Sequence, residues 1–251
     1  MKIGCIIQAR SGSTRLPNKI LMKIQGKETL ILEVERLLNS DKIDQIIVAT
    51  TDSSKDDKVE SLIKSYANPK VSVFRGSEED VLDRYYQAAK KNKIDIIIRI
   101  TGDCPLIDWE VVNHIVDEFL KGDHDYASNV LTKRTYPRGL DTEVFNFKSL
   151  ELMWKNCKDK REREHVTTYI RENPNKFKTK NVENKEDLSN LRWTLDENED
   201  FILIKEIFDS LYPKNNKFNM KDILKFLKNN PNLSNINKHI EQKKNIKNEA
   251  N

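Results

Sequence analysis

The sequence lacks the cysteines that a disulfide-stabilised or zinc-binding protein needs. Cys5, Cys104 and Cys157 are its only cysteines, and they lie far apart without any CxxC spacing. It also has no apolar run close to the roughly 20 residues of a membrane helix. Only Lys2 stands between the initiator and the first apolar run, which ends by Gln8, so no secretory signal peptide is expected. These absences predict a soluble, cytoplasmic protein without a membrane partner.

Two common phosphate-binding motifs are also absent. A Walker A loop requires Gly, four residues and then Gly-Lys-Ser/Thr, but the only Gly-Lys pair, Gly26-Lys27, is followed by Glu28. A dinucleotide fingerprint requires three spaced glycines after the first strand, where only Gly12 is present. Any phosphate-binding loop in this chain is therefore of another kind.

The excess of positive charge is concentrated at the C-terminal end. From Pro213 onward nine lysines stand against three acidic residues, whereas the whole chain has a net charge of +4. This end has no arginine, and Phe218 and Phe226 are its only aromatic residues. Nucleic-acid-binding surfaces are rich in arginine and aromatic side chains, so no nucleic acid is expected as a partner. The region 213–251 is predicted to be a Lys/Asn-rich helix and a solvated, partly disordered tail.

Strand-like and helix-like segments alternate along the first hundred residues. Apolar, β-branched runs predict buried strands at 3–7, 46–50, 71–74 and 94–100, and helical periodicity predicts helices at 30–38, 55–66 and 78–92. A βαβ unit thus recurs at about 25 residues, the cadence of a parallel sheet with right-handed crossovers. The sequence therefore predicts an α/β fold with a mostly parallel sheet and helices on both faces.

The second half of the chain is less regular. Helices are predicted at 111–120, 150–154, 165–171 and 201–211, and extended segments at 126–128, 143–147, 177–182 and 191–195. No glycine-serine linker divides the chain, and its length suits one large domain. We expect one domain over residues 1–212, with a small inserted subdomain at about 128–190.

The segment after the first strand carries three cations, Arg10, Arg15 and Lys19. Between the first two lie the small residues Ser11, Gly12 and Ser13. Small residues let backbone N–H groups approach phosphate oxygens, and the carboxyl end of a parallel strand is where open α/β sheets bind ligands. The charge of this segment alone supports a solvated basic turn at the surface as well as it supports a phosphate-binding loop.

A carboxylate follows the fourth predicted strand, at Gly102-Asp103. Pro105 stops further strand pairing, so Asp103 is expected at the same sheet edge as the first loop, where it would suit a magnesium-nucleotide. Alternatively, Asp103 closes a turn or caps the helix that starts near Asp108.

These two segments resemble motifs of the CMP-sugar cytidylyltransferase family, whose members activate acidic sugars with CTP. The first loop of that family reads Ala-Arg-x-x-Ser-x-Arg-Leu-Pro-x-Lys, and the matching residues are Ala9, Arg10, Ser13, Arg15, Leu16, Pro17 and Lys19. The second motif is Gly-Asp-x-Pro-Leu, matched at 102–106. The resemblance is greatest to the branch of spore coat polysaccharide biosynthesis protein F, and it implies a Rossmann-like, GT-A-like nucleotidyltransferase fold.

The resemblance also implies a set of site residues. The catalytic candidates are Arg10, Arg15, Lys19 and Asp103. The nucleotide-binding candidates are Ala9, Arg10, Ser11, Gly12, Ser13, Arg15, Lys19, Arg75, Ser77 and Asp103. The candidates for holding Mg²⁺ are Asp103, Asp196 and Asp200. The acceptor-binding candidates are Thr101, Arg138, Glu143, His165 and Tyr169.

Several of these residues also have purely structural interpretations. Asp196, with Asp200 four residues on, fits the N-cap of a helix, and Ser77 fits the N-cap of the helix at 78–92. Arg84 is expected to pair with Asp80 at helical spacing. His165 and Tyr169 lie one helical turn apart. They either form hydrogen bonds with the hydroxyl groups of the acceptor substrate or pack as ordinary helix residues.

The implied activity is transfer of CMP from CTP to a sugar or sugar-acid acceptor with release of pyrophosphate, by a homodimer. Relatives that activate ketodeoxy-octulosonate or sialic acid carry Gln near the position of Thr101, which argues against those two acceptors. One alternative is a GT-A-like glycosyltransferase, but Gly102-Asp103-Cys104 lacks the second acid of an Asp-x-Asp pair. The other is a nucleotide-binding module without turnover.

Overall fold

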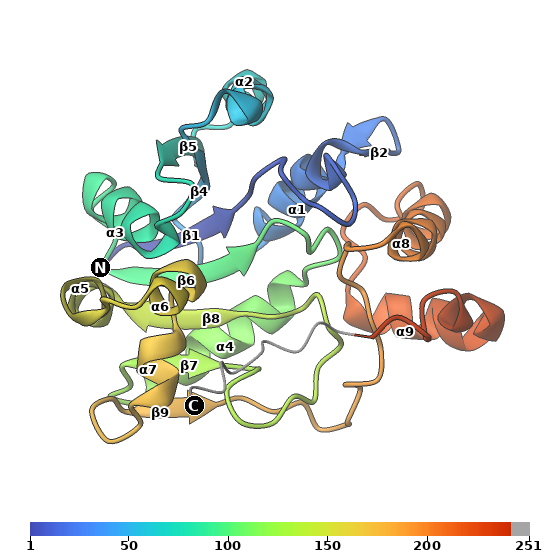
Figure 1. Cartoon of the computed structure of the whole chain (residues 1–251). Coiled ribbons are helices and arrows are strands. Elements are labelled where there is room, and N and C mark those ends of the chain that lie inside the picture. Colours follow the sequence, from blue (N-terminus) through green and yellow to red (C-terminus); the bar gives the residue numbers. More distant parts are fainter. Residues whose placement is uncertain (242–251) are drawn as a thin grey trace, which may run out of the picture.

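The computed structural model describes residues 1–241, in which seven strands form one sheet in the order β5-β4-β1-β6-β8-β7-β9 (Figure 1). The strands are β1 (Ile3–Gln8), β4 (Gln45–Thr51), β5 (Val71–Gly76), β6 (Ile96–Thr101), β7 (Tyr126–Ser128), β8 (Glu143–Asn146) and β9 (Thr179–Asn181). All neighbouring pairs are parallel except the two that involve β8. The predicted α/β fold with a mostly parallel sheet is confirmed.

Helices cover both faces of this sheet (Figure 1). They are α1 (Thr29–Leu37), α2 (Asp57–Ser65), α3 (Val81–Lys91), α4 (Trp109–Lys121), α5 (Phe147–Asn156), α6 (Lys160–His165), α7 (Thr168–Glu172), α8 (Asn198–Leu211) and α9 (Met220–Asn229). The side chains of Cys5 and Ile7 pack in the core with α1, α2, α4, α8 and α9. Ile6, between them, faces the opposite core with α3, α5 and α7. The alternation of a strand's side chains thus gives each face its own core.

A small hairpin, β2 (Lys23–Ile24) and β3 (Lys27–Glu28), lies beside α8 and follows a 3₁₀ turn at Lys19–Leu21. Two further 3₁₀ turns lie at Ser54–Asp56 and Pro231–Asn235. Gln25 at the tip of the hairpin donates to Asp209 of α8 at 2.5 Å. The hairpin is therefore in contact with α8, the helix that follows Asp196.

Local side-chain contacts explain where the helices begin. Asp108 accepts the N–H groups of Glu110 and Val111, at 2.8 and 3.0 Å, and so caps α4. The capping role considered for Asp103 is thereby taken by Asp108. The predicted helix at 78–92 begins three residues late, because Asp80 rather than Ser77 is its N-cap.

One predicted helix of the second half is wrong in detail. The helix predicted at 165–171 is divided into α6 and α7, because Val166 has a φ of 54° and leaves the helical conformation. The segment predicted to be extended at 191–195 forms an isolated parallel bridge between Arg138 and Arg192. The segment 128–190 contributes β8 and β9 to the main sheet, and its role in acceptor binding and dimerisation stays a prediction.

The C-terminal region packs against the main core. Phe218 is buried and meets Phe208 of α8 edge to face at 5.3 Å. Asn237 donates to the carbonyl of Arg192 and to Asp200, at 2.9 and 2.8 Å. The helix expected in this region is present as α9, and buried side chains such as Phe218 and Asn237 show that a solvated end does not begin at residue 213. The rest of the expected tail lies outside the described residues.

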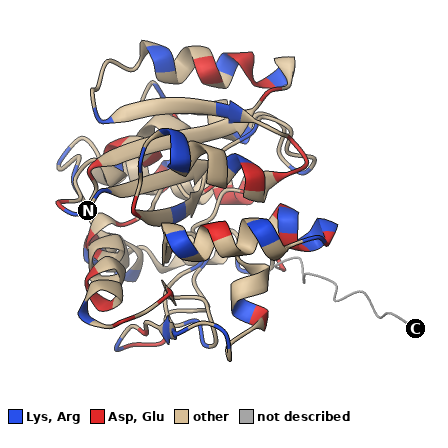
Figure 2. Cartoon of the chain, turned by 90° about the vertical axis from the view of Figure 1, so that its left-hand side faces the viewer, with Lys and Arg blue, Asp and Glu red and all other residues tan. Residues whose placement is uncertain are grey.

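Lys and Arg positions are interspersed with Asp and Glu positions along the helices and loops in the view of Figure 2. Such mixing differs from the continuous basic surface by which proteins bind nucleic acid. None of the helices described combines the length and the hydrophobicity required to span a bilayer.

Candidate nucleotide-binding site

The first loop and the Gly-Asp segment leave the sheet side by side. Gln8 of β1 pairs with Thr101 of β6, and the N–H of Gly102 donates to the carbonyl of Gln8 at 2.9 Å. A cleft of about 880 Å³ opens above this edge. The predicted site residues that line it are Ala9, Arg10, Gly12, Ser13, Arg15, Lys19, Thr101, Asp103, His165 and Asp196. Most of the nucleotide and metal candidates are thus brought together.

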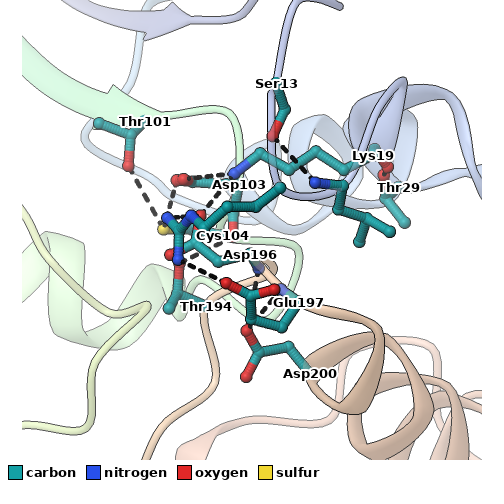
Figure 3. A network of polar contacts seen from close by, with 12 residues as sticks. Ser13, Lys19, Thr29, Thr101, Asp103, Cys104, Thr194, Asp196, Glu197 and Asp200 are labelled. Atoms are coloured by element: carbon teal, nitrogen blue, oxygen red, sulfur yellow. Dashed lines mark hydrogen bonds and ion pairs between the residues drawn. The ribbon is translucent and has the colours of Figure 1, made fainter. Parts of the chain in front are cut away.

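Lys19 lies between the two predicted metal ligands (Figure 3). Its Nζ donates to Asp103 at 2.9 Å and to Asp196 at 2.7 Å. The chain around Lys19 is held locally, since Thr29 Oγ1 donates to the Lys19 carbonyl at 2.8 Å. Burial acts to lower the pKa of Lys19, but the charges of Asp103 and Asp196 outweigh this effect and raise it. Lys19 is therefore a fixed cation shared by two carboxylates.

Asp196 is the most strongly held of these carboxylates. One of its oxygens also meets Arg15 at 2.9 Å, and the other meets Arg192 at 3.1 Å. Burial acts to raise the pKa of Asp196, but Lys19 and Arg15 lower it below its ordinary value. Asp196 therefore stays ionised at neutral pH, with cations on both of its oxygens.

Asp200 supports Asp196 instead of facing the cleft. It is completely buried and accepts the backbone N–H groups of Asp196 and Glu197, both at 3.0 Å, and the Nε of Arg192 at 2.9 Å. Glu197, and not Asp196 as expected, is the N-cap of α8, and Asp200 completes its capping box. Because these donors engage both oxygens of Asp200, the structure does not support its predicted role as a metal ligand.

Asp103 and Asp196 fit the requirements of a bound Mg²⁺. Both carboxylates meet at Lys19, and Oδ1 of Asp103 has only a weak contact, from the Cys104 thiol at 3.6 Å. Magnesium in nucleotide sites is usually held by one or two carboxylates together with phosphates and water. No group of three or more metal-binding side chains gathers within the described part of the chain. The protein side of such a site is thus the open Oδ1 of Asp103 beside Asp196, whose oxygens a metal ion would share with Lys19, Arg15 and Arg192.

Ser11 anchors the first loop and does not line the cleft. Its N–H and its hydroxyl both donate to Asp56 at 2.7 Å, and Asp56 also accepts from the hydroxyl of Thr51. The side chain of Arg10 is half exposed and lies 3.7 Å from Glu78, which also lines the cleft. The predicted contact of Ser11 with a nucleotide is therefore replaced by a structural role.

Arg75 and Ser77 also point their polar groups away from the cleft. Arg75 donates to the carbonyls of Thr51 and Ser53, at 2.9 and 2.7 Å, and pairs with Asp57 and Glu60. The Ser77 hydroxyl accepts the N–H of Asp80 at 3.0 Å. The structure therefore does not bring these two nucleotide-binding candidates to the cleft.

Three acceptor candidates are also placed elsewhere. Glu143 is buried and contacts Arg99 and Tyr126. Arg138 forms a backbone bridge with Arg192. Tyr169 packs against Phe177 and accepts a hydrogen bond from Lys176. Burial acts to raise the pKa of Glu143, but the charge of Arg99 lowers it. His165 reaches the cleft without Tyr169, because the break at Val166 separates their helices. Thr101 and His165 are the acceptor candidates that the cleft retains.

Gln8 and Arg84 are two of the residues that line the cleft without having been predicted as site residues. Gln8 accepts from Arg99 at 3.2 Å through its Oε1, which leaves its amide NH₂ group as a donor toward the cleft. Its position opposite Thr101 on a neighbouring parallel strand was a usable signal. Arg84 was predicted to form an ion pair with Asp80. That prediction is wrong, because Asp80 pairs with Arg163 at 2.6 Å.

Replacing Gly102 with alanine is expected to lower any catalytic activity of this cleft about 10- to 100-fold, because small displacements of reacting groups are costly. A Cβ at this position would lie 2.9 Å from the Cβ of Ala9 and 3.1 Å from the carbonyl oxygen of Gln8. The ends of β1 and β6 would have to separate, which also costs about 1–3 kcal/mol of stability. Steady-state rates and urea unfolding measure the two effects.

Gly122→Ala is the control for this substitution. The atoms nearest to its added Cβ belong to the side chain of His124, which can rotate away. Equal rates for the two alanine variants would show that the close approach of β1 and β6 is dispensable.

A family model described as "Cytidylyltransferase" matches residues 4–249. The chain belongs to this family. It is a nucleotidyltransferase, and the predicted resemblance is confirmed.

Individual relatives agree with this assignment. Uncharacterized protein MJ1063 of Methanocaldococcus jannaschii is 45% identical over 248 residues, covering 97% of each chain. Spore coat polysaccharide biosynthesis protein SpsF of Bacillus subtilis is 35% identical over 212 residues, covering 81% of this chain and 85% of its own. A solved cytidylyltransferase from Leptospira borgpetersenii superposes with a TM-score of 0.88 at 38% identity, covering 97% of this chain and all of the other. The fold of this cytidylyltransferase is thus shared along nearly its whole length.

Proposed function

We propose that this cytidylyltransferase transfers CMP from CTP to a sugar or sugar-acid acceptor and releases pyrophosphate. The observation that carries the proposal is the contact of Lys19 with both Asp103 and Asp196 at the edge where the first loop leaves the sheet. Fixed cations beside two ionised carboxylates suit a triphosphate and its metal ion.

In this proposal the first loop binds the triphosphate. Arg10 is free to turn toward a phosphate because it is half exposed, and the backbone at Gly12 and Ser13 lines the same cleft. Lys19 and Arg15 oppose the negative charge that develops as pyrophosphate leaves. Mg²⁺, held by Asp103 and Asp196, would neutralise phosphate charge when bound. The acceptor hydroxyl attacks the α-phosphorus in line with the departing pyrophosphate, so the protein acts mainly by positioning.

The acceptor is proposed to lie beside Thr101 and His165, the acceptor candidates that line the cleft. The similarity to SpsF supports a product used in the synthesis of a surface polysaccharide or glycan. Assembly as a homodimer and a cytoplasmic location, both expected from the sequence, belong to the same proposal.

Pyrophosphate release tests the proposal directly. The protein is incubated with each of the four ribonucleoside triphosphates, Mg²⁺ and a panel of sugars and sugar acids, and the products are identified by mass spectrometry. We expect release with CTP and one acceptor, together with a CMP-linked product. Consumption of a nucleotide-sugar in place of CTP would indicate a GT-A-like glycosyltransferase. Binding of CTP without turnover across the panel would indicate a nucleotide-binding module.

A further inference from the structure

Arg84 is a buried cation at the cleft that is not paired with a carboxylate among the described residues. It is 1% exposed, lies on the first turn of α3 and lines the cleft. One terminal nitrogen donates to the carbonyl of Ser77 at 2.9 Å, while its Nε is buried without a hydrogen-bond partner. Within residues 1–241 no carboxylate forms an ion pair with it. Buried charges in proteins are normally paired, so this arrangement requires an explanation.

Other arginines with little exposure in the described chain have more partners than Arg84, although Nη2 of Arg36 and Nε of Arg99 are also buried without a hydrogen bond. Arg99 pairs with Glu143, and Arg192 pairs with Asp196 and Asp200. Arg36 has no carboxylate partner, but it donates to two carbonyls and lies over the ring of Phe218 at 4.3 Å. Arg36 does not line the cleft. Arg84 differs from these arginines in being both uncompensated and at the ligand-binding surface.

The chain before α3 is shaped to hold Arg84 in this place. A Cβ on Gly76 would lie 3.2 Å from Cγ of Arg84, so the absence of a side chain there lets Arg84 pack against β5. The Ser77 carbonyl then fixes one end of the guanidinium. Burial lowers the pKa of Arg84 and outweighs the opposite effects of Tyr85, Asp56 and Asp52, while Arg10, which lines the same cleft, lowers it further. The segment that holds the nucleotide-binding candidates Arg75 and Ser77 therefore positions a cation.

We propose that Arg84 is a substrate-binding residue whose buried charge is neutralised by a phosphate group of the nucleotide, next to Arg10. The identity of the anion rests on the proposed function, whereas the missing counter-charge does not. On the opposite wall, Arg15 and Lys19 are already paired with Asp103, Asp196 and Glu197, so they add little net charge. Arg10 has only a half-exposed contact with Glu78 at 3.7 Å, and Arg84 is the arginine of the cleft that forms no ion pair within residues 1–241.

Arg84→Met tests the inference, because methionine keeps the apolar stem and removes the charge. We expect ligand-free R84M to unfold at a higher urea concentration than wild type, since an uncompensated buried charge is removed. We expect its affinity for CTP and for inorganic tripolyphosphate to fall about 10- to 100-fold by calorimetry, the loss typical of a charge-assisted hydrogen bond. Binding of cytidine, which has no phosphate, is expected to stay unchanged.

Arg36→Met is the matched control, since it also removes a buried arginine without an ion pair. R36M is expected to lose stability and to bind tripolyphosphate as wild type does. R84M that is less stable than wild type, or that retains wild-type affinity for tripolyphosphate, would overturn the inference. If wild type binds tripolyphosphate through Arg84 but releases no pyrophosphate from CTP with any acceptor, the proposed function fails and the inference stands.

Discussion

Asp103→Asn is expected to reduce Mg²⁺-dependent pyrophosphate release at least about 100-fold, the usual effect of removing one group that stabilises transition-state charge. The amide has nearly the shape of the carboxylate, but it carries no charge for a metal ion and offers Lys19 a weaker acceptor. Asp103 is one of two carboxylates on Lys19, and its side chain is 25% exposed. The change should therefore act on catalysis more than on folding, which rates and unfolding measured on the same preparation will separate.

The control for D103N is Asp209→Asn on α8. Asp209 pairs with Lys205 on the outside of the helix and also meets Gln25 of the hairpin. It does not line the cleft, so D209N is expected to keep wild-type activity. If D103N keeps wild-type rates at saturating Mg²⁺, the assignment of Asp103 to the metal is wrong. A parallel loss in D103N and D209N would point to a general effect of charge.

The parts of the site that the sequence predicted are those with local signals. The first loop and the Gly102-Asp103 segment each follow an apolar β-branched run, and parallel strands end at the same edge of a sheet. Their meeting in one cleft therefore followed from the strand assignments. Lys19 and Asp103 lie 84 residues apart in sequence, yet their contact was implied once both strands were identified.

The predictions that failed depend on partners that are distant in sequence. The sequence shows no partner for Arg75, but folding brings the carbonyls of Thr51 and Ser53, at and after the end of β4, and two acids of α2 around it. Glu143 was assigned to the acceptor, but the register of β8 against β6 places it opposite Arg99. Strand β8 is the antiparallel exception in the sheet, and no pattern in the sequence fixes that register. Buried ion pairs of this kind can be identified only after the strands are paired.

Backbone geometry explains why His165 and Tyr169, which were predicted on one helix, face different surroundings. The apolar and polar residues of 165–171 have helical spacing, yet Val166 adopts a φ of 54°, which is costly for a β-branched residue. The side chain of Val166 is buried with Ile170 in the core of α3 and α5, which offsets that cost. Burial of one valine thus turns the chain so that His165 faces the cleft and Tyr169 faces Phe177.

Asp200→Asn is expected to give the largest loss of stability, about 3–5 kcal/mol, because it breaks a buried ion pair and leaves Arg192 partly uncompensated. Asp200 is fully buried and joins Arg192 and Asn237 to the first turn of α8. Pyrophosphate release should fall as well, since the backbone N–H of Asp196 is held by Asp200. Urea unfolding and steady-state rates on the same variant give both values.

Asp222→Asn provides the comparison that isolates the buried ion pair. Asp222 completes the capping box of α9 as Asp200 completes that of α8, but it lies partly exposed and forms no ion pair with a described residue. Loss of a cap alone costs about 0.5–2 kcal/mol. If D200N is destabilised no more than D222N, capping is the whole role of Asp200. A larger loss in D200N, accompanied by a lower rate that D222N does not show, assigns the difference to the Arg192 pair that fixes Asp196 beside Lys19.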